Sequence, residues 1–231
     1  MRKVFYTCVT GNYDFIFPPV KTPGWDYLLF TDNPNLEVKG WEIINIESKL
    51  EPQKTARCVK IMPFSFFEAD ISIWADSAIR MNINLDGFVA HAKNNSDFAI
   101  MRHPYRDCIY DELKECKRLC KDEPNIMQKQ VNLYRKNGYP AHNGLVSSGV
   151  IIREHTDRVK EFCSKWWDEV SKYSVRDQLS FNYVAWRDKF KYETFPYLLK
   201  GGFPGITWDP LHRVKKKSRY NHSTSRPTRI P

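Results

Sequence analysis

The sequence predicts a three-layer α/β/α sandwich whose central sheet is mixed and mostly parallel. Two observations support this fold class. Short β-branched and aromatic segments alternate along the chain with longer segments of helical periodicity. The chain has 231 residues, 42% of them hydrophobic, and no Gly/Ser tract, low-complexity run or internal repeat separates two halves. We therefore expect one domain over residues 1–211, followed by a basic tail or linker over residues 212–231.

The first part of the chain predicts four strands and one helix. The predicted strands are residues 3–10, 27–31, 41–46 and 71–74, which are rich in β-branched and aromatic side chains. Gly11 and Asn12 end the first of them with a tight turn. The predicted helix covers residues 52–62, because Pro52 suits the first turn of a helix and Pro63 stops it.

The second part predicts two more strands and four helices. The strands are residues 98–101 and 146–153, and the helices are residues 111–120, 126–137, 156–172 and 177–186. The helix at 156–172 has the clearest amphipathic pattern, with Val159, Trp166 and Val170 on one face. Gly149 interrupts the last strand. Strands and helices thus continue to alternate, as in a layered α/β domain.

Most of the positive charge lies near the end of the chain. The net charge is +9, and seven Lys/Arg residues with no acid lie between His212 and Arg229, which leaves +2 for the rest of the chain. Such a tail is typical of a solvated segment, a link to a further domain, or an arm that contacts phosphates. No nucleic-acid recognition motif accompanies it, so we do not expect nucleic acid as a partner.

Cysteine usage and hydropathy predict the compartment. The six cysteines are scattered without a CxxC pair. Cys116 and Cys120 lie one helical turn apart, but no second pair exists to complete a zinc site, so we expect free thiols in a reducing compartment. No apolar run approaches the ~20 residues of a membrane span, and Met1 leads through charged residues straight into a strand. We expect a cytoplasmic protein without a transmembrane segment.

The segment at residues 72–82, SIWADSAIRMN, carries the clearest signal for chemistry. Asp76 ends an apolar run and has small neighbours, among them Ser77. Ligands of α/β sheets bind at strand ends, and Mg²⁺ or Mn²⁺ bridges one or two carboxylates to substrate phosphates. The alternative is an aspartate that ends the strand and caps the next turn through its own backbone.

Three motifs follow one another in an order that resembles A-type nucleotide-sugar glycosyltransferases. SIWADS resembles their DxD region, VSSGVII their N-x-G-V-M strand, and RDQLSFN their DQ-x-x-x-N motif. With YTCVTGNYD, KTARCVKIMP and GLVSSGVIIREH, the chain resembles over residues 3–187 a glycosyltransferase-like family of plants, bacteria and large DNA viruses. The resemblance implies the A-type, Rossmann-like fold. It also implies metal-dependent transfer of a sugar, glucose or a close relative, from a UDP-sugar to a glycan or glycoprotein acceptor.

The resemblance implies a Mn²⁺ or Mg²⁺ cofactor bound by Asp76. A full DxD motif would place a second carboxylate at Trp74 or Ala78, and neither side chain can bind a metal. Asp76 is then the carboxylate ligand of this turn, and diphosphate oxygens and water supply further positions. In related enzymes a late histidine completes the set. His212 is the best positional match, with His222 behind it, and a surface histidine in a basic tail is the alternative.

The resemblance also implies where the donor nucleotide binds. Arg57 and Lys60 match basic residues that face the diphosphate, which a guanidinium can bind bidentately and an ammonium as a point charge. A solvated helix face is the alternative. The residues implied for the uracil base are Thr10, Gly11, Tyr13 and Asp32. Among these the tyrosine would stack on the base, and the aspartate would accept a hydrogen bond from its edge.

Transfer chemistry is implied for Ser148, Gly149, Asp177 and Gln178. The small pair lets the backbone approach the sugar. Asp177 is the general base in an inverting enzyme, and Asp177 or Gln178 lies near the sugar face in a retaining one. A helix N-cap is the alternative for Asp177. Further candidates for sugar or acceptor contacts follow two strands: His103, Arg106, Tyr110, Glu112, Arg153, Glu154 and His155.

The predicted function is therefore that of a UDP-sugar-dependent hexosyltransferase. The incomplete DxD motif keeps a second hypothesis open, a catalytically silent sugar-nucleotide or glycan-binding module of the same fold.

Overall fold

The computed structural model describes residues 1–12, 14–196 and 204–208. Its centre is a seven-stranded sheet of order β3-β2-β1-β4-β7-β6-β8. The strands are β1 (Lys3–Val9), β2 (Trp25–Thr31), β3 (Glu42–Asn45), β4 (Ile71–Ala75), β6 (Phe98–Arg102), β7 (Val146–Glu154) and β8 (Glu193–Phe195). Strand β7 runs antiparallel to its neighbours β4 and β6, and every other pair is parallel. The mixed, mostly parallel sheet predicted from the sequence is confirmed.

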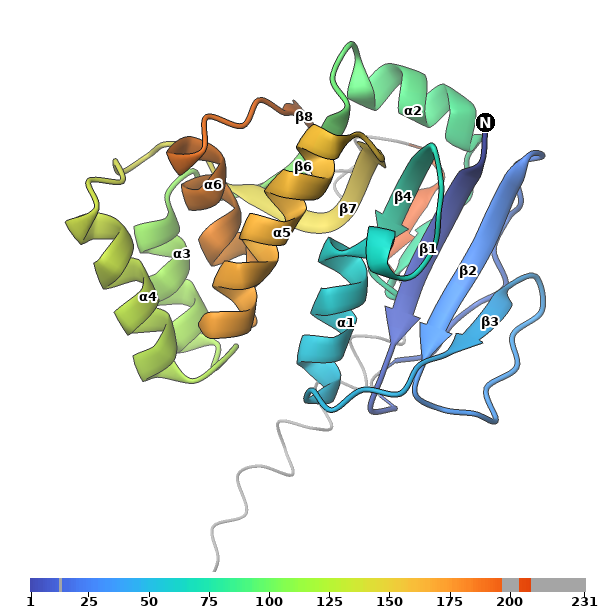
Figure 1. Ribbon diagram of the computed structural model, residues 1–231, viewed down its shortest axis with the longest axis horizontal. Coiled ribbons are helices and arrows are strands. Elements are labelled where there is room, and N and C mark those ends of the chain that lie inside the picture. Colours follow the sequence, from blue (N-terminus) through green and yellow to red (C-terminus); the bar gives the residue numbers. More distant parts are fainter. Residues whose placement is uncertain (13, 197–203, 209–231) are drawn as a thin grey trace, which may run out of the picture.

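Helices cover both faces of this sheet (Figure 1). They are α1 (Pro52–Ile61), the short 3₁₀ helix η1 (Pro63–Ser65), α2 (Leu85–Lys93), α3 (Ile109–Arg118), α4 (Pro124–Lys136), α5 (Asp157–Lys172) and α6 (Asp177–Arg187). Helix α2 packs near β6 and β8, together with a small antiparallel sheet of β5 (Ile79–Met81) and β9 (Ile206–Trp208). The other α-helices belong to the opposite layer, in which α5 contacts both α1 and α6.

The period of two along each strand divides the apolar side chains between two cores. In β1, Val4 and Tyr6 join the core beneath α1, α5 and α6, whereas Phe5 joins the core beneath α2. The amphipathic face predicted for α5 is confirmed, since Val159 and Trp166 are fully buried in the first core. A sheet buried on both faces is the expected environment for parallel strands.

The predicted elements agree with the observed ones to within two residues at each end. Five elements were not predicted, among them the short 3₁₀ helix η1. Strands β5, β8 and β9 have three residues each, too few to show a pattern. Helix α2 carries Gly87 in its first turn, a poor helix former, and begins because Asn84 accepts a hydrogen bond from the Gly87 N–H at 2.9 Å. None of the helices that the structure describes is long and apolar enough to cross a membrane.

The strand directions gather several chain segments at one edge of the sheet. Strands β1, β2 and β4 are parallel, so the residues that follow them, Thr10, Asp32 and Asp76, lie at their shared carboxyl edge. Strand β7 runs the other way and therefore begins there, and the Asp76 N–H donates to the Gly149 carbonyl at 2.8 Å. This edge is where ligands of α/β sheets bind.

Phe162 tests the aromatic core between α5 and the sheet. Its buried ring stacks on Phe190 with centroids 3.7 Å apart and contacts the ring of Phe181 at 5.3 Å. We expect Phe162→Ala to lower the free energy of unfolding by about 3–5 kcal/mol, because the cavity cannot close around stacked rings. Urea unfolding followed by circular dichroism measures this. The exposed Leu50→Ala is the control, and an equal loss in both variants would contradict the packing described here.

Candidate functional site

A cleft of about 880 Å³ lies at the carboxyl edge of the sheet. It is lined by the ends of β1 and β4, the first residues of β7, the amino-terminal part of α6 and the exposed side of α1. Most of the site residues implied by the resemblance line it: Thr10, Gly11, Arg57, Lys60, Asp76, Ser77, Ser148, Gly149, Asp177 and Gln178. Asp32 does not, and Tyr13, His212 and the tail 212–231 lie outside the described residues.

A buried ion pair forms the floor of the cleft. Lys60 comes from the last turn of α1 and Asp177 from the first turn of α6, and the side chains are 1% and 2% exposed. The Lys60 ammonium lies 2.7 Å from Asp177 Oδ2 and donates to the Ser148 hydroxyl at 2.9 Å. Ser148 in turn donates to Asp177 Oδ2 at 2.9 Å. The three side chains thus close a triangle that joins α1, α6 and β7.

Electrostatics keep Asp177 ionised. Burial alone would raise the pKa of its carboxyl group, but Lys60, Arg57 and Arg176 together outweigh burial and hold that pKa well below its usual range. Burial lowers the pKa of Lys60, while the two carboxylates of Asp177 and Asp76 act in the opposite direction. An aspartate whose pKa is lowered in this way is a weak proton acceptor at neutral pH.

Arg57 lies on the same side of α1, one turn before Lys60. Its Nε lies 3.6 Å from Asp177 Oδ2 and donates to the Val175 carbonyl at 3.2 Å. The guanidinium remains 23% exposed, and it lines the cleft. The side of α1 that carries Arg57 and Lys60 therefore faces the cleft, where two cations lie beside one buried carboxylate.

Asp76 lies at the end of β4, beside this cluster. Its Oδ1 accepts hydrogen bonds from the Trp74 indole at 2.9 Å and from Lys60 at 3.5 Å, and the side chain is 31% exposed. Its Oδ2 accepts no hydrogen bond from the described residues. Gly149 leaves room beside it, since a Cβ there would lie 3.6 Å from Oδ2 and 3.0 Å from Ile79 Cδ1.

One structural alternative considered from the sequence is confirmed and another is wrong. The Asp76 backbone caps the following turn, because the Ile79 N–H donates to the Asp76 carbonyl at 2.8 Å, while the Asp76 side chain accepts hydrogen bonds from Trp74 and Lys60. Asp177 is not the N-cap of α6, because Arg176 occupies that position. Asp177 Oδ1 accepts only the N–H of the next residue, Gln178, at 3.0 Å.

Two of the implied base-binding residues, Thr10 and Gly11, lie in the turn after β1. The Asp32 carboxylate accepts the Gly11 N–H through both oxygens, at 2.8 and 3.1 Å, and the Thr10 hydroxyl donates to the Pro52 carbonyl at 2.6 Å. Gly11 has φ +63°, and a Cβ there would lie 2.9 Å from Pro52 Cβ. Glycine is required here for both its backbone conformation and its size. Asp32 does not line the cleft itself, but its hydrogen bonds to Gly11 hold the turn that does.

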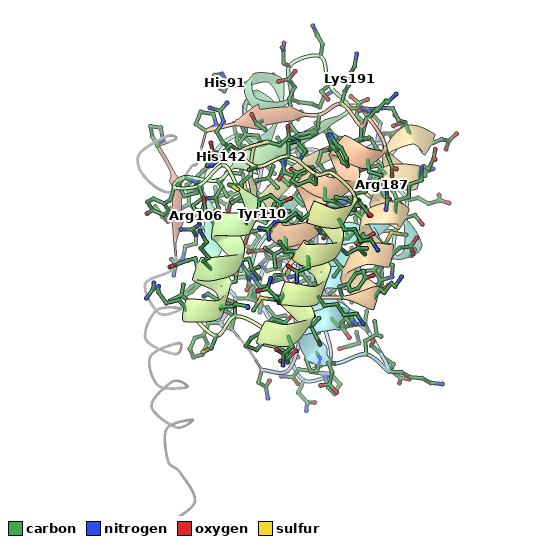
Figure 2. All side chains as sticks on the ribbon, turned by 90° about the vertical axis from the view of Figure 1, so that its left-hand side faces the viewer. His91, Arg106, Tyr110, His142, Arg187 and Lys191 are labelled. Atoms are coloured by element: carbon green, nitrogen blue, oxygen red, sulfur yellow. The ribbon has the colours of Figure 1, made fainter. Side chains whose placement is uncertain are left out.

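A smaller cavity of about 180 Å³ adjoins the cleft and shares Lys121, Ser147, Arg176 and Gln178 with it. Three of the further candidates line it. The Arg106 guanidinium donates to Glu112 Oε2 at 2.7 Å, and His103 Nε2 lies 3.6 Å from the same oxygen. Burial lowers the pKa of His103. Figure 2 shows Arg106 on the face of the molecule that carries α3 and α4. Tyr110 does not line the cavity, since its hydroxyl donates to the Tyr139 carbonyl.

Residues 153–155, named from the sequence as further candidates for sugar or acceptor contacts, line neither the cleft nor the smaller cavity. They end β7, and because β7 is antiparallel its end lies at the opposite edge of the sheet. Arg153 is buried and donates to the Ile61 carbonyl at 3.1 Å. Glu154 pairs with Lys93, and His155 lies 2.9 Å from the Ser72 hydroxyl.

Sequence reasoning missed several charged residues of the cleft. Asp14 accepts a hydrogen bond from the Ser77 hydroxyl at 2.8 Å, and Lys54, Lys121 and Asp122 also line the cleft. All lie at loops or helix ends, where a charged residue usually means only contact with solvent. No signal in the sequence distinguishes them from other surface charges.

Comparison with known proteins shows the family to which the chain belongs. The TOD1/MUCI70, glycosyltransferase-like domain matches residues 30–199. The chain is also 26% identical over 175 residues to a protein of Arabidopsis thaliana named "Probable hexosyltransferase MUCI70", with 69% of this chain covered. The match covers 29% of the Arabidopsis protein, so the chain spans less than a third of that relative. Since the domain match extends over more than half of the 231 residues, the chain belongs to the TOD1/MUCI70 glycosyltransferase-like family.

Proposed function

We propose that the protein is a metal-dependent hexosyltransferase that moves a sugar, glucose or a close relative, from a UDP-sugar to a glycan or protein-linked acceptor. The observation that carries the proposal is the cluster of Lys60, Asp177, Ser148 and Asp76 at the carboxyl edge of the sheet, inside a cleft of about 880 Å³. Membership of a glycosyltransferase-like family supports the same reaction class.

The cations of the cleft suit a diphosphate. Arg57 and Lys60 point to one region from α1, and Lys54 and Lys121 line the same cleft. A guanidinium that is partly exposed can bind phosphate oxygens while it keeps its contact with Asp177, because it carries five N–H donors. A bound diphosphate would thus contact these basic side chains in place of water, and the fold already holds the side chains in position.

Asp76 suits a divalent cation. Its Oδ1 is held by Trp74 and Lys60, which fixes the carboxylate, and Oδ2 accepts no hydrogen bond from the described part of the chain. Mg²⁺ and Mn²⁺ accept such a single carboxylate when phosphate oxygens and water complete the coordination. Asp14, joined to Ser77 beside Asp76, is a second carboxylate of the cleft. When bound, the ion would offset negative charge on the departing diphosphate.

For Asp177 we propose a positioning role. It is buried, ionised and bonded to Lys60 and Ser148, so it aims both side chains at the cleft. The role of general base, which the resemblance implies, needs a carboxylate that can take a proton from the acceptor. Gln178 is held by the Val146 carbonyl and by Arg176, at the junction between the cleft and the smaller cavity. We propose that the smaller cavity receives the transferred sugar or the acceptor hydroxyl.

A catalytically silent sugar-nucleotide or glycan-binding module of the same fold is the second candidate, and the incomplete DxD motif favours it. The two candidates differ in turnover alone. Purified protein incubated with UDP-glucose and Mn²⁺ should release UDP slowly even without an acceptor if it is a transferase. A silent module would bind UDP in the presence of Mn²⁺ and release none from the sugar nucleotide.

Asp76→Asn should remove Mn²⁺-dependent binding of UDP while the fold stays intact. The amide can still accept the Trp74 hydrogen bond but is a poor ligand for a hard cation. In wild type, UDP with Mn²⁺ at ~100 Kd should add about 2.7 kcal/mol to the free energy of unfolding, measured by thermal shift. Asp70→Asn, just before the other end of β4, is the control. Unchanged Mn²⁺-dependent affinity in Asp76→Asn would exclude the metal from this position.

Arg57→Ala should weaken binding of UDP by about 10- to 100-fold, since a hydrogen bond to a charged group contributes about 1.5–3 kcal/mol. Binding of uridine should change far less, because uridine lacks the charge that Arg57 is proposed to meet. Isothermal titration calorimetry with both ligands measures the difference, and Arg118→Ala on the exposed surface of α3 is the control. Equal losses for the two ligands would place Arg57 away from the diphosphate.

Asp177→Asn separates the two roles proposed for this residue. As a positioning residue, its loss leaves Lys60 buried without its closest counter-ion, and the free energy of unfolding should fall by about 3–5 kcal/mol. Affinity for UDP should fall with it. As a general base, its loss should in addition lower turnover by about 10²- to 10⁴-fold, while UDP affinity stays near wild type.

The pH dependence gives an independent check of Asp177. Its native pKa is lowered, so its stabilising contribution is complete above the unfolded pKa of about 3.9 and is lost as the pH falls below that value. The difference in unfolding free energy between wild type and Asp177→Asn should therefore be largest near neutral pH and shrink in acid. Urea unfolding at several pH values measures it, with the exposed Asp168→Asn as control. A difference that does not change with pH would contradict the ionised pair.

A further inference from the structure

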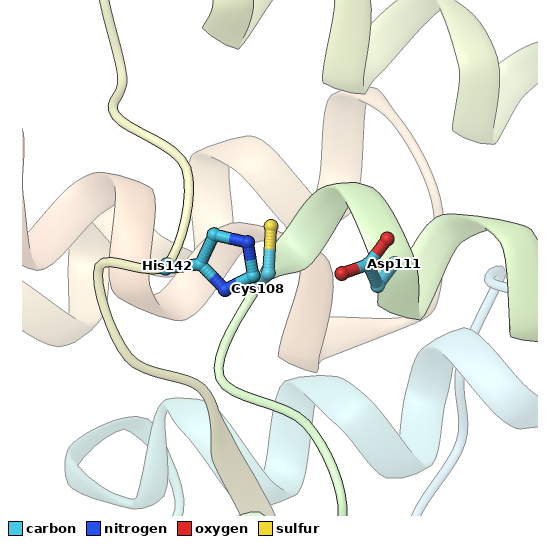
Figure 3. Close-up of side chains that lie close together, drawn as sticks. All are labelled: Cys108, Asp111 and His142. Carbon is cyan, nitrogen blue, oxygen red and sulfur yellow. The ribbon is translucent and has the colours of Figure 1, made fainter.

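Three side chains of different chemistry meet outside the cleft. Cys108 directly precedes α3, Asp111 lies in its first turn, and His142 comes from the segment between α4 and β7 (Figure 3). One potential ligand atom from each lies within 4.8 Å of the other two. A point therefore exists within about 2.8 Å of all three, and bonds from zinc to oxygen, nitrogen and sulfur are about 2.0–2.3 Å long. If each of the three ligand atoms moved about half an ångström towards this point, all three could bond to a zinc ion.

Asp107 orients the imidazole of His142. The two side chains meet through Nδ1 of the ring and Oδ1 of the carboxylate, 2.8 Å apart. Histidines that bind a metal through one nitrogen usually donate the other N–H to a carboxylate, which fixes the tautomer. With Nδ1–H donated to Asp107, Nε2 carries the lone pair. Figure 3 shows the ring lying beside the Cys108 thiol.

Cys108 is buried at the amino-terminal end of α3. It is the N-cap residue of α3, yet its side chain makes no capping hydrogen bond there. Serine, threonine, aspartate and asparagine are the residues that cap helices well. Asp111 uses Oδ1 for Lys114, 2.9 Å away, and a carboxylate has a second oxygen to offer.

We propose that Cys108, Asp111 and His142 bind a zinc ion, with water as the fourth ligand. A mixed set of thiolate, imidazole and carboxylate suits Zn²⁺, whereas Mg²⁺ and Mn²⁺ prefer oxygen ligands. His142 is exposed, so solvent can deliver the ion from that side. Figure 2 shows His142 near Arg106 and Tyr110, at the start of α3. The bound ion would tie the segment before β7 to the start of α3.

Cobalt substitution tests the site without reference to enzymatic activity. The full chain is dialysed against EDTA and then titrated with Co²⁺. We expect a thiolate-to-cobalt charge-transfer band and the visible absorption of tetrahedral cobalt, both saturating at one equivalent and abolished by Zn²⁺. Cys108→Ser should remove the charge-transfer band. The matched control is Cys120→Ser, at an exposed cysteine just after α3, which should leave the band unchanged. Asp76→Asn should also leave it unchanged.

His142→Ala guards against a folding defect in Cys108→Ser, because the His142 side chain is exposed. Its affinity for Zn²⁺, measured by competition with a chromophoric chelator, should fall by at least about 10- to 100-fold, and Asp107→Asn should lower it by about 10- to 100-fold. Absence of the cobalt band in wild type, or its loss in Cys120→Ser instead of Cys108→Ser, would overturn the proposal. Surface ion pairs alone would then account for the contacts of Asp107 and Asp111.

Discussion

The buried ion pair between Lys60 and Asp177 is the interaction on which the candidate site depends. A charge pair removed from water must recover a large desolvation cost, and it does so only where geometry and further hydrogen bonds are good. Here Ser148 bonds to both partners, and the indole of Trp166 donates to the Asp177 carbonyl at 3.2 Å. Helices α1, α5 and α6 and strand β7 are thereby fixed around one point, and the cleft is fixed with them.

The antiparallel direction of β7 determines which of its residues reach the cleft. Parallel strands bring only their carboxyl ends to a site, whereas β7 brings its first residues. Ser148 and Gly149 can therefore lie directly beside Asp76 at the end of β4. Because Ser148 and Gly149 are small, they leave the Asp76 carboxylate accessible from the cleft.

Much of this fold could be predicted from the sequence, because periodicity and turn residues mark the long elements. Asp76 could be selected because it stands at a strand end, whereas Lys60 and Ser148 follow from the resemblance to the glycosyltransferase-like family. The direction of β7 could not be predicted from local pattern, so the sequence did not show that Arg153, Glu154 and His155 lie at the edge of the sheet opposite the cleft. Cleft residues such as Lys54 and Asp14 could not be found, because only tertiary packing distinguishes them from other solvated charges.

Strand β1 lies in the centre of the sheet but outside the residues that match the family domain. The domain match begins at residue 30, inside β2, and ends at residue 199, before β9. A fragment with those limits would lack β1 and all of β2 except Phe30 and Thr31. Strand β4 would lose its neighbour β1, and its edge would be unpaired in the middle of the molecule, a geometry that promotes aggregation. The similarity that reveals the family is thus shorter than the piece of chain needed to build its cleft.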